Sequence, residues 1–227
     1  MNTTVNTHTT ANALEPQWLL DRRNSGNETY SNLPVPSAKD ENWRFASVLS
    51  EDIDAFKSAP MPEDHAIDYA LSNSKLVEDP IAELIFVDDH LVQSKPLPKQ
   101  LIDKGVRFLS LNEAIEDHSH LLEPYFLKDS TRLGSQKYFG LHASNVKAGA
   151  VLYVPKGVEI NEPIAVYHWS NTDKGLICPH TLIIAEAQSK VSLIDVLAST
   201  TEVNRCLNIS ASNIQSHPSA NIYRKVI

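Results

Sequence analysis

The sequence predicts a mixed α+β N-terminal part followed by a mainly-β part made of short, regularly interrupted strands. The clearest evidence is residues 149–169, where apolar runs with period-2 alternation are cut by corners at residues 155–157 and 161–163. Proline fixes one backbone angle and glycine adopts angles that other residues resist, so each corner has a physical cause. The pattern repeats in four later runs, at residues 181–185, 191–197, 207–211 and 222–226. This spacing is typical of one wall of a β-helix or of a jelly-roll barrel.

Composition and charge limit the possible functions. The 227 residues suffice for one large domain or two modest ones. The net charge of -8 argues against a nucleic-acid partner, because phosphates require a basic surface. No apolar run approaches the ~18 residues of a membrane span, and the first ten residues do not resemble a signal peptide. The two cysteines, Cys178 and Cys206, form no disulfide framework. We therefore expect a cytoplasmic protein with neither nucleic-acid nor membrane partners.

The first forty residues are predicted to contain little regular structure. Residues 1–13 are rich in Thr and Asn and are expected to form a disordered tail. An apolar patch at residues 18–20 predicts a short helix with basic residues near its end at Arg23. A polar, turn-rich stretch to Ser31 is expected after it, and the prolines of residues 33–36 then predict an extended connector.

Residues 39–130 alternate between helical and strand patterns. Ser50, which is followed by acidic residues, is a favourable N-cap and predicts a helix start. Residues 82–93 alternate on both sides of a polar tip at residues 88–90 and predict a β-hairpin. The other predicted elements are a single helical turn at 66–71, a strand at 106–109, a helix from Leu111 to near Glu123, and a short helix over 125–132. A domain boundary is placed near residue 130.

Two clusters carry side chains that can bind metal ions. Asp88, Asp89 and His90 are consecutive at the hairpin tip, where neighbouring side chains point in different directions, so a plain turn is favoured. His118 and His120 lie two residues apart on a predicted helix and do not share a face there. A solvated helix surface is therefore the favoured interpretation of the second cluster.

Cys178 and His180 are the best-placed pair for a metal, because residues two apart in an extended segment point to the same side. A zinc site needs one or two further ligands. His142, His168 and Cys206 are available, but no spacing selects them. Buried cysteine is also a common core residue. We assign no metal, cofactor-binding or catalytic residue. The absence of a phosphate loop and of a nucleophile elbow favours a scaffold over an enzyme.

Five motifs follow one another in a recognisable order. They are EPQWLL with LPVP and KDENWRF within residues 15–45, IFVDDHLV at 85–92, VRFLSLNEA at 106–114, GAVLYVPKGVEINEPI at 149–164, and the strand pattern at 180–194. In this order they resemble the SufB/SufD family, the scaffold subunits of the SUF iron–sulfur cluster assembly system. The tryptophan-bearing segment favours the SufD side, and Trp43 is expected to anchor the connector onto a neighbouring part of the fold.

The resemblance implies a helical or mixed N-terminal domain over residues 14–130 and a right-handed parallel β-helix from residue 131. It also implies pairing with a SufB-like scaffold subunit and a SufC-like ABC ATPase, and a role in building iron–sulfur clusters, with no cofactor bound by this chain alone. Family members continue for about as long again. Residues 131–227 are therefore expected to be a truncated β-helix without the ATPase-docking region, and its last strand is expected to self-associate or to need a partner.

A cupin-like metal-dependent enzyme is the alternative hypothesis. In it, the strands of residues 151–197 close into a jelly-roll barrel around a His-bound metal. Such a site needs a His-x-His pair and a glutamate on one strand and a further histidine on another. The histidines of the strand-rich half are isolated from one another in sequence: His142, His168, His180 and His217. This deficit favours the scaffold.

Overall fold

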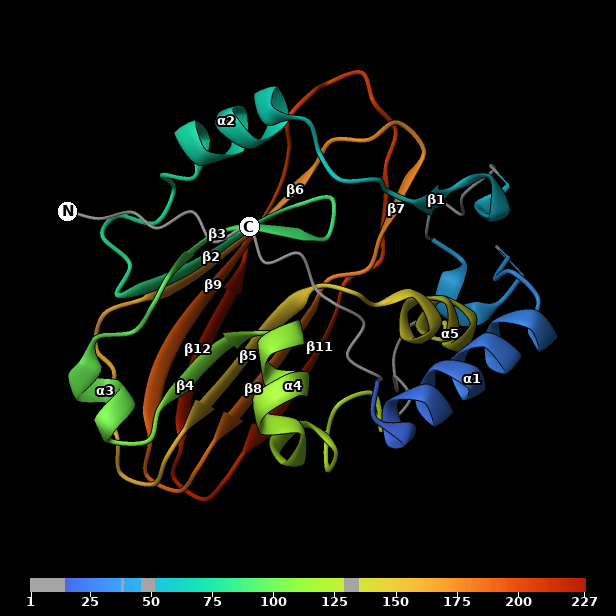
Figure 1. Ribbon diagram of the computed structural model, residues 1–227. Helices are drawn as coiled ribbons and strands as arrows, with labels where there is room; N and C mark the ends of the chain where they lie inside the picture. Colours follow the sequence, from blue (N-terminus) through green and yellow to red (C-terminus); the bar gives the residue numbers. More distant parts are fainter. Residues whose placement is uncertain (1–14, 38, 46–51, 129–134) are drawn as a thin grey trace.

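Three β-sheets form the centre of the structure, and helices cover their outer faces (Figure 1). The computed structural model describes residues 15–37, 39–45, 52–128 and 135–227. The expected disordered tail at residues 1–13 and the expected helix start at Ser50 lie outside the described residues. The described part is an α+β structure whose sheets are parallel or mixed.

Each sheet of the strand-rich half is a stack of parallel strands from successive passes of the chain. The stacks are β5 (Gly149–Val154), β8 (His180–Ala185) and β11 (Ala211–Ser216); β6 (Ile164–Ser170), β9 (Lys190–Ser199) and β12 (Asn221–Val226); and β7 (Gly175–Ile177) with β10 (Leu207–Asn208). Gly149 pairs with His180, and His180 pairs with Ala211, a step of 31 residues each time. The first two passes of the chain therefore add one strand to each sheet, and the third adds β11 and β12 to the two larger sheets.

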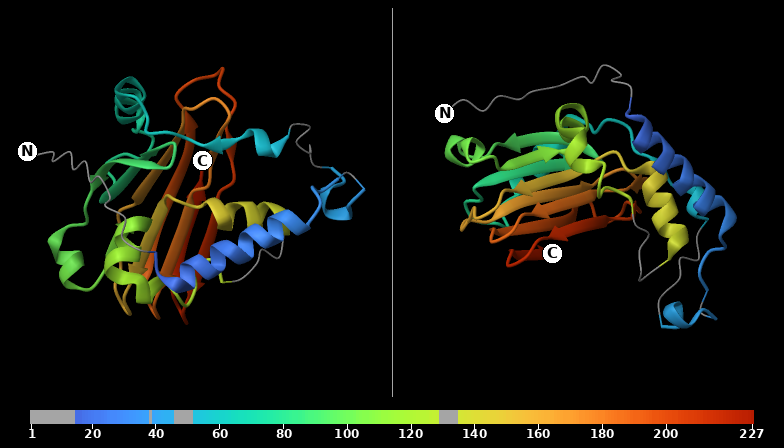
Figure 2. Two further views of the ribbon diagram at one scale, coloured as in Figure 1. Left: turned by 45° about the vertical axis from the view of Figure 1, so that its right-hand side comes forward. Right: turned by 90° about the horizontal axis from the view of Figure 1, so that it is seen from below.

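The N-terminal part contributes a strand to one end of each stack. These strands are β1 (Lys57–Ser58) on β7, β2 (Ala82–Val87) on β6 and β4 (Arg107–Ser110) on β5. The β4 strand is antiparallel, and β3 (His90–Lys95) forms an antiparallel hairpin with β2. Viewed from below, the strands are layered in colour order from green to red, so the last strands lie at the opposite end of the stacks (Figure 2).

The corners between the two larger sheets are also stacked. Turns at residues 155–158, 186–189 and 217–220 each close with a backbone hydrogen bond of 3.0–3.2 Å between the first and fourth residues. The third residue of each turn has a positive φ: 71° at Gly157, 62° at Gln188 and 62° at Ser219. Glycine favours this conformation, but only the first of the three turns has one. The first turn is therefore the one that the sequence reveals.

Side chains alternate between an interior core and two covered outer faces. Leu152, Val166 and Ile183 belong to the core that the two larger sheets enclose. Their neighbours Val151 and Leu182 point outward and pack beneath helices. The helices are α1 (Gln17–Asn32), α4 (Leu111–Leu122) and α5 (Gln136–Asn145) on one face and α2 (Asp64–Asn73) on the other, with α3 (Lys99–Asp103) before β4. Strands buried on both faces have continuous apolar sequences, as parallel sheets require.

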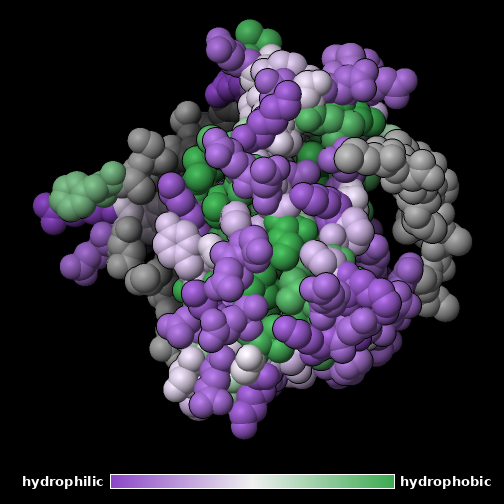
Figure 3. Space-filling model, turned by 90° about the vertical axis from the view of Figure 1, so that its left-hand side faces the viewer, coloured by the Kyte–Doolittle hydropathy of each residue, from purple (hydrophilic) through white to green (hydrophobic). Residues whose placement is uncertain are grey.

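Figure 3 shows one side of the molecule coloured by hydropathy. Hydrophobic side chains remain visible there in a strip near the centre, with hydrophilic side chains around it. Among the described helices, none has the length and apolar character needed to cross a membrane.

Helices α1 and α5 cross at two glycines. A Cβ atom on Gly140 would lie 2.7 Å from the carbonyl oxygen of Gly26, and one on Gly26 would lie 2.8 Å from Cβ of Ala143. The two helices can approach this closely only because residues 26 and 140 are glycines, which have no side chain. This packing explains why α1 continues to Asn32, whereas the sequence predicted a short helix near Arg23 and turns to Ser31. Tertiary contacts override the weak helix propensity of this polar stretch.

Several sequence predictions are confirmed. The hairpin at residues 82–93, the strand at 106–109 and the helix from Leu111 are present as β2–β3, β4 and α4. A capping box between Ser110 and Glu113 starts α4. Trp43, in the 3-10 helix η1 (Glu41–Trp43), is partly buried and packs on Tyr138, with ring centroids 5.5 Å apart. Trp43 therefore anchors the connector as expected.

Other predictions are wrong in extent or missed. The single turn at residues 66–71 is part of the ten-residue helix α2, and the run at 207–211 belongs to two strands, β10 and β11. Residues 123–128 form turns in place of the predicted helix, whose other residues, 129–132, lie outside the described part. The short 3-10 helix η2 (Ile53–Ala55) begins after Asp52, which accepts a hydrogen bond from the backbone N–H of Asp54. Helices α3 and α5 were not predicted.

Replacing Gly140 by alanine tests the α1–α5 crossing. Glycine to alanine stabilises an ordinary helix by ~1 kcal/mol. At this crossing the added methyl group collides with backbone, and we expect a loss of about 2–3 kcal/mol, typical of overpacking. Urea unfolding measures the difference, with the exposed Ser25→Ala on α1 as control. A Gly140→Ala chain as stable as the parent would contradict the close crossing.

Candidate functional site

Two buried histidines form a hydrogen-bonded chain between helix α5 and the strand stack. Nε2 of His142, on α5, lies 2.9 Å from Nδ1 of His180, the first residue of β8. Nδ1 of His142 lies 2.7 Å from the carbonyl oxygen of Ile209. Nε2 of His180 lies 2.9 Å from the side-chain oxygen Oδ1 of Asn213 on β11. These hydrogen bonds therefore connect α5 with two successive passes of the backbone.

The partners determine where the protons lie. Because Nδ1 of His142 faces a carbonyl oxygen, that nitrogen carries the hydrogen and Nε2 is an acceptor. Nδ1 of His180 then donates to it, which leaves Nε2 of His180 as an acceptor. Oδ1 of Asn213 faces this nitrogen, so the neutral scheme requires the amide group to be rotated by 180°, which exchanges its oxygen and nitrogen and lets Nδ2 donate to Nε2 of His180. Every ring nitrogen then has a partner while both rings stay neutral.

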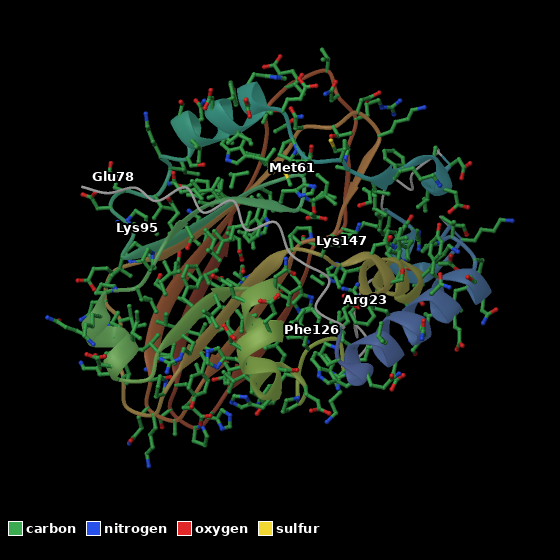
Figure 4. The ribbon with its side chains drawn as sticks, in the orientation of Figure 1. Arg23, Met61, Glu78, Lys95, Phe126 and Lys147 are labelled. Atoms are coloured by element: carbon green, nitrogen blue, oxygen red, sulfur yellow. The ribbon has the colours of Figure 1, made fainter. Side chains whose placement is uncertain are left out.

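Burial holds both histidines in the neutral form. It lowers the pKa of His142 to about 4, with the hydrogen bond to Ile209 raising it and the charge of Arg23 lowering it further. Burial, followed by the neighbouring His142, lowers the pKa of His180 well below its usual value. The centroid of the Phe126 ring lies 4.4 Å from the centroid of the His180 ring. Arg23 and Phe126 are labelled in Figure 4.

This geometry leaves no room for a metal between the rings. Zinc lies ~2.0–2.1 Å from each histidine nitrogen, so a bridging ion requires a nitrogen–nitrogen distance well above the 2.9 Å present between His142 and His180. Within the described residues, no group of three or more His, Cys, Asp and Glu side chains could hold a metal ion. The arrangement acts as a polar connection between α5 and the strands.

Cys178 lies in the apolar core under the helices, with Leu141 and Leu176. It is 1% exposed, and burial, with the nearby charge of Asp89, raises the pKa of its thiol. A protonated, enclosed thiol is a poor metal ligand. Cys206, the other free cysteine, is partly exposed and donates a hydrogen bond from its thiol to the carbonyl oxygen of Thr172.

The predicted turn at the β2–β3 hairpin tip is confirmed, but its two aspartates are not solvated. Both have positive φ, 49° at Asp88 and 65° at Asp89. Asp88 is buried and accepts hydrogen bonds from the backbone N–H groups of Asn171 and Thr172 and from the Thr172 hydroxyl, at 2.7–2.9 Å. Asp89 accepts the N–H of Cys178, and burial raises its pKa to about 6. The tip therefore ties the hairpin to the β6–β7 corner.

The remaining candidate histidines are not gathered into a site. Helix α4 departs from helical geometry at His118, where φ is −134° and ψ is 30°. At this kink the rings of His118 and His120 lie 6.1 Å apart. His118 is partly exposed and His120 is exposed, so the predicted solvated helix surface is confirmed. His90 lies at the hairpin, 3.5 Å from the carbonyl oxygen of Ala59.

A second polar group lies between the two larger sheets, and sequence analysis missed it. Asp195 is 2% exposed; it accepts hydrogen bonds from Arg224 at 2.6 and 2.8 Å and from the Thr181 hydroxyl at 3.0 Å. His168 stacks on Phe86 nearby, and burial lowers its pKa to about 3. The sequence signal that could have revealed Asp195 is the alternation of side chains along β9, because this alternation places Asp195 on the same interior side as Leu193.

Comparisons with known proteins all indicate one family. The family described as "SufBD protein N-terminal region" matches residues 6–166. The iron–sulfur cluster assembly protein SufD of Bacillus subtilis (strain 168) is 33% identical over 190 residues, 82% of this chain and 43% of that protein. An iron–sulfur cluster assembly SufBD family protein of Staphylococcus epidermidis (strain ATCC 12228) is 24% identical over 222 residues, 92% of this chain and 46% of that protein. The chain thus spans less than half the length of these relatives.

Protonation of the buried histidines is expected to destabilise the fold in mild acid. The pKa of His142 is about 4 in the folded chain, below the ordinary 6.5, so the unfolded chain binds more protons between these values. The stability that the folded chain has from keeping His142 neutral is fully present above pH 6.5 and is lost as the pH falls toward 4. Asp89 acts in the opposite sense, because its raised pKa lets the folded chain bind the extra proton between about 4 and 6.

Urea unfolding at several pH values between 7.5 and 4.5 separates the two effects. We expect His142→Gln to be less stable than the parent at pH 7.5 but to lose less stability on acidification. His65→Gln, at a side chain that is 74% exposed, is the control and should leave the pH profile unchanged. A parent and a His142→Gln chain with parallel pH profiles would contradict a neutral buried His142.

We also expect the purified chain to contain no stoichiometric iron or zinc, because the Cys178 thiol is buried and both nitrogens of His180 have partners. Elemental analysis by mass spectrometry measures this. About one metal ion per chain, lost in Cys178→Ala but kept in Cys206→Ala, would overturn the expectation and revive a metal site.

Proposed function

The chain belongs to the SufBD family, and from this premise we propose that it is a SufD-like scaffold component of the SUF iron–sulfur cluster assembly machinery. The observation that carries the proposal is the family match over residues 6–166. This match covers both the helical N-terminal part and the first strands of the stacks. The relatives named above supply the process, iron–sulfur cluster assembly.

We infer that the parallel stacks are the beginning of a right-handed parallel β-helix. Three features support this inference: the step of 29 or 31 residues between paired strands, the contribution of successive passes to the same sheets, and the stacked corners at 155–158, 186–189 and 217–220. The right hand follows from the general preference for right-handed connections between parallel strands. Strands stacked in this way cover one another and leave edges at the two ends only.

The proposed partners are a SufB-like scaffold subunit and a SufC-like ABC ATPase. The outer edge of β11 and β12 supports contact with a strand-bearing partner, because no further strand pairs with it in the described part of the chain. Several large hydrophobic side chains near this edge are about half exposed: Ile214, Tyr223, Val226 and Ile227. Unpaired backbone groups beside exposed apolar side chains favour the addition of another strand.

The proposed scaffold acts by protein–protein interaction in the cytoplasm, without catalysis of its own. Two of its internal polar groups, the His142–His180 pair and Asp195 with its partner Arg224, hydrogen-bond to one another or to neighbouring strands. The nascent cluster is cargo of the assembled complex, and this chain alone binds no cofactor. Nucleic acid and membrane are not among the proposed partners, in keeping with the acidic net charge of -8.

The cupin-like alternative is not favoured. A jelly roll is built from antiparallel strands, whereas β5, β8 and β11 pair in parallel, as do β6, β9 and β12. The histidines of this half also lie on different sides of the sheets. His180 faces α5, whereas His168 stacks on Phe86 in the interior.

Co-expression of the tagged chain with the SufB-like and SufC-like proteins of the same organism tests the proposal. We expect the scaffold partner and the ATPase to co-purify with the chain. Ile214→Lys, at the half-exposed edge position on β11, should reduce recovery of the scaffold at least ~10-fold, which corresponds to ~1.4 kcal/mol. Leu91→Lys, at an exposed position on β3, is the matched control. Failure of both proteins to co-purify, or equal losses in the two variants, would count against this role for the edge.

A further inference from the structure

One ring nitrogen of His168 has no hydrogen-bond partner among the described residues. The side chain is 4% exposed and stacks on Phe86, with the ring centroids 5.1 Å apart and the ring planes 13° from parallel. Its Nδ1 atom is enclosed and unpaired. A buried polar atom that has lost its hydrogen bonds to bulk water is almost always paired with another group or with an ordered water. Nδ1 of His168 therefore requires a partner that the described side chains do not supply.

A small cavity lies beside this ring, between the two larger sheets. Its volume is about 10 Å³. The polar side chains that line it come from β6, β8, β9 and β12 and from the residue before β11: His168, Thr181, Asp195, Arg224 and Ser210. A cavity needs ~10–15 Å³ to hold one water molecule. The cavity is therefore the size of a single water.

The charged side chains of this cavity already neutralise each other. Nη2 and Nε of Arg224 lie 2.6 and 2.8 Å from Oδ2 of Asp195. The other carboxylate oxygen, Oδ1, accepts the Thr181 hydroxyl at 3.0 Å. A metal ion placed here would face the guanidinium, and an anion would face the carboxylate, at a depth where water screens charges poorly. The charge of the wall therefore favours a neutral ligand.

His168 is itself neutral and needs a small hydrogen-bonding partner. Burial, with the charge of Arg224, lowers the pKa of its imidazole to about 3. A neutral imidazole has one donor and one acceptor nitrogen, so Nδ1 needs an acceptor in one tautomer and a donor in the other. Water supplies either. Size, charge and hydrogen-bonding capacity thus select the same ligand.

The wall also offers the other hydrogen bonds that a buried water requires. An internal water typically makes about three. An arginine has five N–H donors, and the contacts with Asp195 use one on Nε and one on Nη2 of Arg224. The remaining N–H groups of Arg224, the carboxylate oxygens of Asp195 and the Ser210 hydroxyl all belong to residues that line the cavity.

We propose that one ordered water molecule binds in this cavity, where it hydrogen-bonds to Nδ1 of His168 and to the Asp195–Arg224 pair. His168 lies on β6, Asp195 on β9 and Arg224 on β12, which are three successive strands of one sheet. The water therefore joins three passes of the chain through their interior side chains, in addition to the backbone ladder. This site is independent of the proposed role in iron–sulfur cluster assembly.

Crystal structures of the full chain and of two His168 variants test the site. In the parent we expect electron density for one water at about 2.7–3.2 Å from Nδ1 of His168. His168→Phe can stack on Phe86 in the same way but has no ring nitrogen, so the water should be lost. His168→Asn, whose amide can take the place of Nδ1, should keep it. His65→Phe, at a side chain that is 74% exposed, is the control and should leave the water in place.

Nuclear magnetic resonance of the parent chain provides a test that does not depend on the folding of any variant. We expect a water-selective Overhauser experiment to show a cross-peak between a bound water and the Cε1 proton of His168, which is adjacent to Nδ1. The absence of this cross-peak, a cavity without density, density for a metal ion or an anion, or an unchanged water in His168→Phe would overturn the proposal.

Discussion

The pairing of each strand with the strand about 31 residues later is the interaction on which the rest of the structure depends. Side chains alternate along a strand, so a slip of one residue would exchange the interior and outer faces of a whole sheet. In the observed register Leu152 lies over Ile183 in the interior, and Val151 lies over Leu182 beneath the helices. Both faces are apolar, and both therefore need a cover.

The N-terminal part supplies the outer cover and closes one end of the stacks. Helices α1, α4 and α5 lie over one sheet and α2 lies over another, while β1, β2 and β4 extend the three stacks. Two polar devices hold these pieces in position. Asp88 and Asp89 fasten the β2–β3 hairpin to the β6–β7 corner and to Cys178. The His142–His180 chain fastens α5 to β8 and β11. Helical cover and strand stack are thus joined by specific hydrogen bonds as well as by apolar contact.

The buried polar groups of this architecture serve the fold itself. The polar groups that would attract attention as catalytic candidates are used internally. Asp195, Thr181 and Arg224 tie β8, β9 and β12 together, and Cys178 is enclosed by leucines. On the surface, the β11–β12 edge, with which no further strand pairs in the described part of the chain, carries half-exposed apolar side chains.

The sequence by itself determined the features that depend on local chemistry. The hairpin around residues 88–89, the capped helix from Leu111, the corner at 155–157 and most of the strands follow from alternation, capping and turn residues, and the motifs placed the chain in its family. Tertiary structure alone decided the length of α1, which depends on the Gly26–Gly140 crossing, and the existence of α5. It also decided the later corners, where Gln188 and Ser219 adopt a conformation suited to glycine because the turn below them sets the path. The histidine chain joins residues 38 and 33 apart, and no local pattern encodes a contact between segments that meet only when the strands stack.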